Sequence, residues 1–152
     1  MDSFAALISN THLLIAVFSC ASAQFLKVIG EYVFTKKIDK ATIISTGGMP
    51  SSHSAFVVAL AASIGAVEGL YSPLFAISCV FALIVMHDAA GVRRAAGKQA
   101  QVINEMVSRL KYIGINPDEK LKELLGHSPI EVVAGAIWGI IISTAAYSLF
   151  IN

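Results

Sequence analysis

Charged residues are scarce in this chain of 152 residues, where Asp, Glu, Lys and Arg together make up 14% of the sequence. Soluble domains carry about 25% charged residues, so this composition excludes an ordinary soluble fold. Hydrophobic residues reach 56%, and the mean hydropathy is +0.72. The length fits a single domain over residues 1–152, and the composition predicts an integral membrane protein.

Several other features are also missing. The N-terminus has no basic region and no convincing cleavage site, so we expect the first apolar segment to stay as an anchor. Cys20 and Cys79 lie within apolar stretches, which indicates small buried side chains rather than a disulfide or a metal pair. The sequence has no His or Cys pairs at ligand spacing, no acidic cluster for two metal ions and no Walker glycine loop. We therefore expect no metal and no other cofactor.

Four apolar segments approach the length of about 20 residues that a membrane-spanning helix needs. They are Thr11 to Phe34, Ser52 to Leu70, Pro73 to Ala90, and Ile130 to Ile151. The predicted fold is all-α, a polytopic membrane helix bundle with about four transmembrane helices. Between the third and fourth segments we expect a cytoplasmic insertion made of an amphipathic helix, Lys98 to Tyr112, and a short helix from Pro117 to about Gly126.

The basic residues indicate the orientation. Of the eleven Lys and Arg residues, ten lie between the first and second or between the third and fourth segments, and Lys27 lies inside the first. With four spans these two connections share one face, which the positive-inside rule assigns to the cytoplasm. We expect both termini outside and the motif-bearing loops inside. Because the basic residues accompany membrane ends rather than a soluble face, nucleic-acid binding is not expected.

The stretch Gly47 to Ser54 predicts a tight turn that leads into the N-terminus of the second apolar helix. The first N–H groups of a helix have no internal partner and carry partial positive charge, so they form a ready anion site. Ser51, Ser52 and His53 add donors, and the anion we expect is a phosphate. The alternative is that Ser51 or Ser52 simply caps a membrane helix.

Charged residues stand at two further places near the same membrane face. Asp88 lies at the end of the third segment, Arg93 and Arg94 follow it, and guanidinium groups suit phosphate. They are alternatively a stop-transfer pair with Asp88 as a local partner. Lys27 stands four residues before Glu31 in the first segment. It is either a functional cation within the membrane or a lysine that reaches the interface and pairs with Glu31.

The start of the fourth segment has two interpretations. Ser128 and Glu131 have the spacing of a capping box, in which the glutamate is structural. His127 and Glu131 are also four residues apart, so the carboxylate can hold one ring nitrogen and fix the tautomer of the other. A histidine held in this way has the parts of an activated nucleophile. Further along, Gly135 and Gly139 form a G-x-x-x-G pair that allows close helix contact.

Three motifs together resemble a known family: PSSHS at residues 50–54, DAAGVRRAAGKQAQVIN at 88–104 and LLGHSPIEVVAG at 124–135. They are similar to the divergent phosphatidic acid phosphatase type 2 family of small bacterial and plastid membrane proteins, from about Gln24 to Gly139. The resemblance implies a bacterial cytoplasmic membrane protein with a metal-free phosphohistidine mechanism. By position, His127 matches the nucleophile, Glu131 the acid that orients it, and His53 the general acid.

The sequence departs from the parent superfamily in several places. Ser52 replaces a glycine, Glu131 replaces an aspartate, and Leu121 stands where an arginine is expected. The first superfamily motif, Lys, six residues, Arg-Pro, is absent. We infer that other side chains bind the phosphate in its place, with a charge clamp from Lys27, Arg93 and Arg94. The full predicted binding set is Lys27, Ser51, Ser52, Asp88, Arg93 and Arg94.

Together with these residues, the resemblance implies a phosphatase that hydrolyses a lipid phosphate monoester or diphosphate at the membrane. Lipid phosphatases of the parent superfamily commonly work on the extracytoplasmic face of the membrane, whereas the charge rule here favours a lipid of the cytoplasmic leaflet, such as phosphatidylglycerol phosphate, phosphatidate or a polyprenyl phosphate. One alternative is a non-catalytic phosphate-binding or transport protein. Another is a membrane scaffold that associates through Gly135 and Gly139. Four helices are few to enclose a lipid head group, so we expect a homo-oligomer, a dimer or higher.

Overall fold

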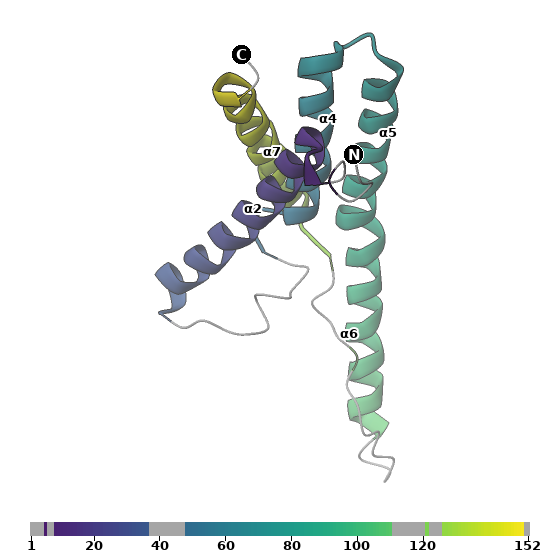
Figure 1. Cartoon of the computed structure of the whole chain (residues 1–152). Helices are drawn as coiled ribbons and strands as arrows, with labels where there is room; N and C mark the ends of the chain where they lie inside the picture. The colour runs from purple at the N-terminus through teal and green to yellow at the C-terminus, as the bar shows by residue number, and fades with distance from the viewer. Residues whose placement is uncertain (1–4, 6–7, 37–47, 111–120, 122–125, 151–152) are drawn as a thin grey trace.

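The computed structural model describes residues 5, 8–36, 48–110, 121 and 126–150, and its regular elements there are all helices (Figure 1). The all-α class is therefore confirmed. In chain order the elements are α2 (Thr11–Thr35), α4 (Ser52–Glu68), α5 (Pro73–His87), the single π turn η1 (Asp88–Val92), α6 (Arg93–Leu110) and α7 (Pro129–Phe150).

Three stretches are long and apolar enough to cross a membrane: Thr11–Val33, Pro73–Arg109 and Pro129–Leu149. The fourth predicted span is a shorter apolar helix, α4, with 17 residues. At 1.5 Å per residue it is about 25 Å long, less than the hydrocarbon core of about 30 Å. In place of the predicted four or so transmembrane helices, the described residues thus contain three helices long and apolar enough to span a membrane and one shorter apolar helix.

The shorter helix α4 is the centre of the structure, because it packs against α2, α5 and α7. Its buried positions are occupied by small side chains, among them Ala55, Ala59, Ser63 and Gly65. Small residues let helix backbones approach closely, which is how membrane helices gain packing energy without a hydrophobic difference between lipid and protein. The residues at the start of α4 are consequently held between two other helices.

The glycine pair of α7 makes the closest of these approaches. A Cβ atom built on Gly135 would collide with the carbonyl oxygen of Ser51, and one on Gly139 would collide with that of Ala55. The G-x-x-x-G face therefore packs against α4 of the same chain. This use of the face disagrees with a scaffold that associates through Gly135 and Gly139.

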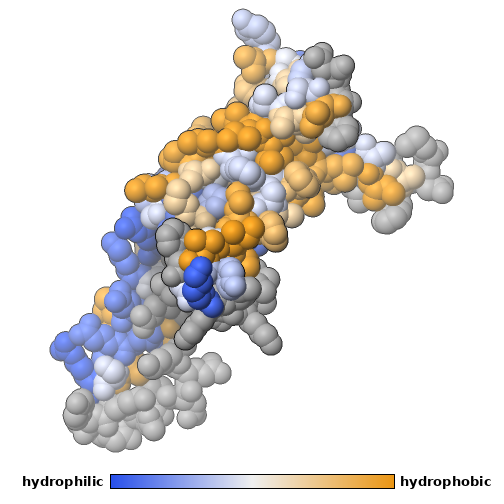
Figure 2. Space-filling model, turned by 90° about the vertical axis from the view of Figure 1, so that its left-hand side faces the viewer, coloured by the Kyte–Doolittle hydropathy of each residue, from blue (hydrophilic) through white to orange (hydrophobic). Residues whose placement is uncertain are grey.

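The predicted boundary between the third span and the amphipathic helix is wrong. We expected the span to end at Ala90 and a separate helix to begin at Lys98, but the chain stays helical from Pro73 to Leu110. The 37 residues Pro73–Arg109 span about 55 Å, which exceeds the hydrocarbon thickness, so α6 extends beyond it. Hydrophilic surface gathers towards the lower end of the molecule in Figure 2, the end at which α6 lies in Figure 1. The predicted short helix from Pro117 lies almost wholly outside the described residues.

Replacing Gly135 by alanine should destabilise the protein, because the new Cβ would force α7 away from the Ser51 carbonyl. Overpacking of this kind costs roughly 1–3 kcal/mol. Gly30→Ala is the matched control, since a Cβ on Gly30 meets nothing within 4 Å and alanine favours a helix. Thermal unfolding in detergent should give a lower midpoint for Gly135→Ala and an equal or higher one for Gly30→Ala. Equal midpoints in the two variants would contradict the packing described.

Candidate active site

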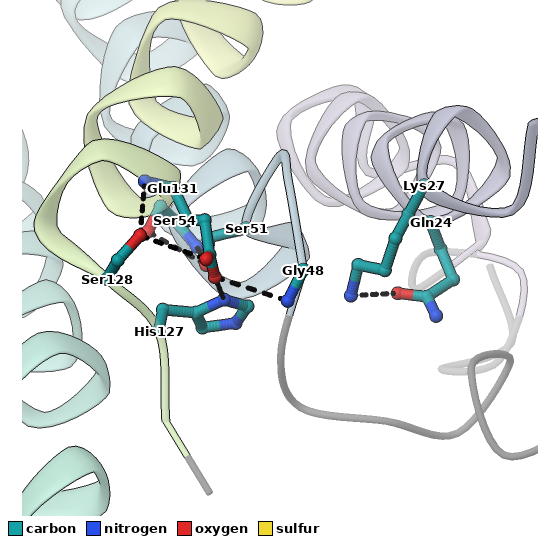
Figure 3. Close-up of polar contacts among 8 residues, drawn as sticks. All are labelled: Gln24, Lys27, Gly48, Ser51, Ser54, His127, Ser128 and Glu131. Carbon is teal, nitrogen blue, oxygen red and sulfur yellow. Dashed lines mark hydrogen bonds and ion pairs between the residues drawn. The ribbon is translucent and has the colours of Figure 1, made fainter. Parts of the chain in front are cut away.

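The pair His127 and Glu131 forms the centre of the candidate site (Figure 3). His127 Nδ1 lies 2.9 Å from Glu131 Oε2, and the histidine side chain is 1% exposed. The Ser128 hydroxyl donates to Glu131 Oε1 at 2.9 Å and accepts from the Glu131 N–H at 3.4 Å. Glu131 thus contributes to the start of α7 through one oxygen and holds His127 through the other. Glu131 therefore makes a local contact at the helix start and holds His127 at the same time, so both interpretations apply to it.

The contact with Glu131 assigns the roles of the two ring nitrogens in neutral His127. An ionised carboxylate only accepts hydrogen bonds, so Nδ1 carries the hydrogen and Nε2 carries the lone pair. Nε2 is buried and has no hydrogen-bond partner among the described residues. Most buried polar atoms have a hydrogen-bond partner, so this nitrogen is an exception among the described side chains.

The main chain around His127 is held by the π turn η1. The His127 N–H donates to the Ala89 carbonyl oxygen at 2.9 Å. Gly126, just before it, has φ +87°, and a Cβ there would collide with the main chain of Arg93 and Arg94. Glycine is required at this position both by the backbone angle and by the close approach. The start of α7 is therefore seated directly on the middle of the long helix.

The start of α4 lies beside this pair. Ser51 is the N-cap, and its hydroxyl accepts from the Ser54 N–H at 3.4 Å and from the Ser54 hydroxyl at 3.1 Å. The Ser51 N–H donates to the main-chain oxygen of Glu131 at 3.0 Å. The capping alternative is thus confirmed for Ser51, which is fully buried, while Ser52 is 8% exposed. A role of either hydroxyl in phosphate binding stays a prediction.

His53, in the first turn of α4, faces the histidine at the start of α7. The two ring centroids are 6.1 Å apart, in an edge-on arrangement with an interplanar angle of 64°. Lys27, Asp88 and Arg93 lie within electrostatic range of His53. The structure therefore brings together both predicted catalytic histidines, Glu131 and four of the predicted binding residues, which are Lys27, Ser51, Asp88 and Arg93.

The cations of the site are held in different ways. Lys27 is 4% exposed, and its ammonium donates to Gln24 Oε1 at 3.2 Å. The described ion pairs include none between Lys27 and Glu31, so they do not support the alternative in which these two side chains pair. Arg93 Nε binds Asp88 Oδ2 at 2.7 Å, which confirms the local partner predicted for Asp88. Arg94 is exposed.

Three contributors to the site were missed because they act through main-chain atoms. The Gly48 N–H donates to Glu131 Oε2 at 3.2 Å, the Ala89 carbonyl binds His127, and Gly126 permits the close approach described above. Every residue carries the same N–H and carbonyl groups, so residue type does not reveal such a contact. The available signal was the glycine at positions 48 and 126, because glycine is favoured where the backbone has a positive φ, as it has at both.

The arrangement combines a lone pair on nitrogen, a second imidazole, buried or half-buried cations and the start of a helix. These groups suit attack on an anionic centre and stabilisation of its charge. Within the described part of the chain, no group of three or more His, Cys, Asp or Glu side chains is placed to hold a metal ion.

Gly48→Ala should disturb the His127–Glu131 pair. Gly48 has φ +93°, and its Cβ would lie 3.1 Å from Lys27 Cδ, so either the lysine stem or the Gly48 N–H must move away. Gly69→Ala is the control, because Gly69 has φ +85° and open space around it. We expect the imidazole ¹⁵N signals of His127 to shift in Gly48→Ala and to stay in place in Gly69→Ala. Identical spectra for the two variants would contradict a role for the Gly48 N–H.

Comparison with known proteins gives one family and one curated relative. Residues 8–142 match the model of the Divergent PAP2 family, where PAP2 stands for phosphatidic acid phosphatase type 2. The chain is also 44% identical over 148 residues to "Uncharacterized membrane protein YuiD" of Bacillus subtilis (strain 168), an alignment that covers 90% of this chain and 94% of the relative. No solved structure matches significantly.

Proposed function

This chain belongs to the divergent PAP2 family, and we propose that it is a membrane-embedded phosphatase that hydrolyses a lipid phosphate monoester or diphosphate. The observation that carries the proposal is the state of His127. Its Nδ1 is held by Glu131, while its buried Nε2 has no partner among the described residues and His53 lies opposite. A nitrogen nucleophile requires this combination of fixed tautomer and available lone pair.

In the proposed first step, His127 Nε2 attacks phosphorus and the bond from phosphorus to the lipid oxygen breaks. Protonated His53 gives its proton to the leaving oxygen, so the lipid departs as a neutral alcohol or as the lower phosphate. His127 then carries the phosphoryl group on Nε2 and a positive ring charge, which the Glu131 carboxylate stabilises across the 2.9 Å contact. In the second step His53 accepts a proton from water, the resulting hydroxide attacks phosphorus, and the N–P bond breaks to release phosphate.

The negative charge of the phosphoryl group is met by Lys27, Arg93 and the first N–H groups of α4. Asp88 engages Nε of Arg93, which leaves the two terminal nitrogens of that guanidinium for phosphate oxygens. Ser51, Ser52, Asp88 and Arg94 complete the binding set in this proposal. Because these groups are preorganised, they stabilise the transition state without reorganisation.

The positive-inside rule supports a cytoplasmic position for the site, with both termini outside and a lipid phosphate of the inner leaflet as substrate. We propose the bacterial cytoplasmic membrane as the location and a dimer or higher homo-oligomer as the assembly. The support for an oligomer is that four helices are few to enclose the head group of a lipid.

Phosphate release from phosphatidylglycerol phosphate, phosphatidate and polyprenyl phosphates tests the proposal directly. With chelator present, His127→Ala should lower kcat by at least about 10³-fold, since the nucleophile is lost, and His53→Ala by about 10²–10⁴-fold. His87→Ala is the matched control, because His87 is exposed on the long helix, and it should retain wild-type turnover.

A labelled phosphoprotein that is labile to acid should form in the wild type and be absent from His127→Ala. Unchanged release in both histidine variants would remove His127 and His53 from the mechanism. Saturable phosphate binding without release from any lipid would favour the alternative of an anion-binding or transport protein.

A further inference from the structure

The long helix from Pro73 to Leu110 changes its hydrogen bonding at one turn, η1 (Asp88–Val92). At the end of this turn the Arg93 N–H donates to the carbonyl oxygen of Asp88, five residues back. In a regular α-helix the same N–H would bond the carbonyl four residues back, which belongs to Ala89. Single π turns of this kind occur frequently at functional sites.

The π turn changes the partner of the Ala89 carbonyl. Because the Arg93 N–H bonds Asp88, the Ala89 oxygen accepts the N–H of His127 instead, at 2.9 Å. Ala89 is 3% exposed, so this hydrogen bond is protected from water. The turn thereby ties the long helix to the main chain of the residue that leads into α7.

The same turn brings two charged side chains together. Neighbours on an α-helix are three or four residues apart, whereas bonding to the fifth residue stacks residues five apart. Asp88 and Arg93 have this spacing, and their side chains form the 2.7 Å ion pair. The charges of both lie within range of His53.

Gly126 completes the contact from the other side. Its positive φ turns the chain, and the absence of a side chain lets the segment before His127 lie against the main chain of Arg93 and Arg94. Three independent features, the shifted hydrogen bond, the ion pair and the glycine, therefore meet at one turn.

We propose that the π turn η1 is the positioning element of this site: its Ala89 carbonyl fixes the main chain of His127, and its five-residue spacing presents Arg93 beside Asp88. The inference rests on the proposed phosphatase function, for which the position of His127 matters. A regular helix would direct the Ala89 carbonyl along its own axis and leave the His127 N–H without this acceptor. A displacement of about 1 Å at a reacting group can lower turnover by about 10²-fold.

Deletion of Ala90 tests this role, because it removes the extra residue of the turn. The Arg93 N–H then bonds Asp88 four residues back, and the Asp88–Arg93 ion pair is kept at helical spacing. The Ala89 carbonyl is taken by the Arg94 N–H, so His127 loses its partner. Gly91→Ala is the matched control: it keeps the residue count, and its Cβ comes no closer than 3.8 Å to His87.

The measurement uses the full chain in detergent, labelled with ¹⁵N-histidine, which gives four amide signals for the four histidines. In the Ala90 deletion the His127 amide should exchange about tenfold faster, since one backbone hydrogen bond is lost. Its kcat should fall about 10²-fold with KM within about threefold of wild type. Gly91→Ala should match the wild type in both. An Ala90 deletion that matches Gly91→Ala in exchange or in kcat overturns the proposal.

The His87 amide lies within the long helix, so its protection reports whether the deletion variant is folded. If the deletion variant is not folded, the measurement is made on Gly126→Ala instead, because the new Cβ pushes the chain before His127 away from η1. Gly69→Ala is then the control, since Gly69 has a similar positive φ and open space around it. Gly126→Ala must then show the faster His127 exchange, and a rate equal to that of Gly69→Ala overturns the proposal. Absence of turnover in the wild type counts against the phosphatase function, whereas the exchange rates still decide the role of the turn.

Discussion

The carboxylate of Glu131 is the interaction on which the candidate site depends. One oxygen binds His127 Nδ1 and the Gly48 N–H, and the other binds the hydroxyl of Ser128. The main-chain oxygen of the same residue accepts from the Ser51 N–H. One residue thus connects the start of α7, the start of α4 and the chain that leads into α4. A partly buried carboxylate needs hydrogen-bond donors to stabilise its charge, and the same donors fix the position of the side chain.

Small residues make this convergence possible. Gly135 and Gly139 bring α7 against α4. Gly126 lets its main chain approach that of the long helix, and Gly48 lets its main chain approach the stem of Lys27. In a membrane protein the lipid is as apolar as the side chains, so close backbone packing and internal hydrogen bonds hold helices together. The tight packing and the polar site therefore occupy the same end of α4.

The polar groups of the site lie at helix ends and at an irregular turn. Ser51 begins α4, Ser128 precedes α7, and Asp88 opens the π turn of the long helix. Away from water, backbone groups that lose a helical partner must find another within the protein. Here the Ala89 carbonyl finds the His127 N–H, which turns a departure from regular helix geometry into a link between two elements.

The sequence by itself determined the all-α class, the apolar helices, the family and the two motifs that contain His53 and His127. Composition and local spacing suffice for these, because apolar length, helix caps and the four-residue step from His127 to Glu131 are properties of neighbouring residues. The same local logic failed at Ala90, where a polar run suggested the end of a helix that in fact continues.

Only the tertiary structure decided which partner each polar group has. It paired Lys27 with Gln24, placed the glycines of α7 against α4, and brought the Gly48 N–H and the Ala89 carbonyl to the Glu131–His127 pair. Main-chain donors and acceptors are the same in every residue, so residue type does not reveal their partners. A helix turn whose hydrogen bonds reach five residues back instead of four is likewise not visible in the composition. Their roles arise from packing between segments distant in the chain.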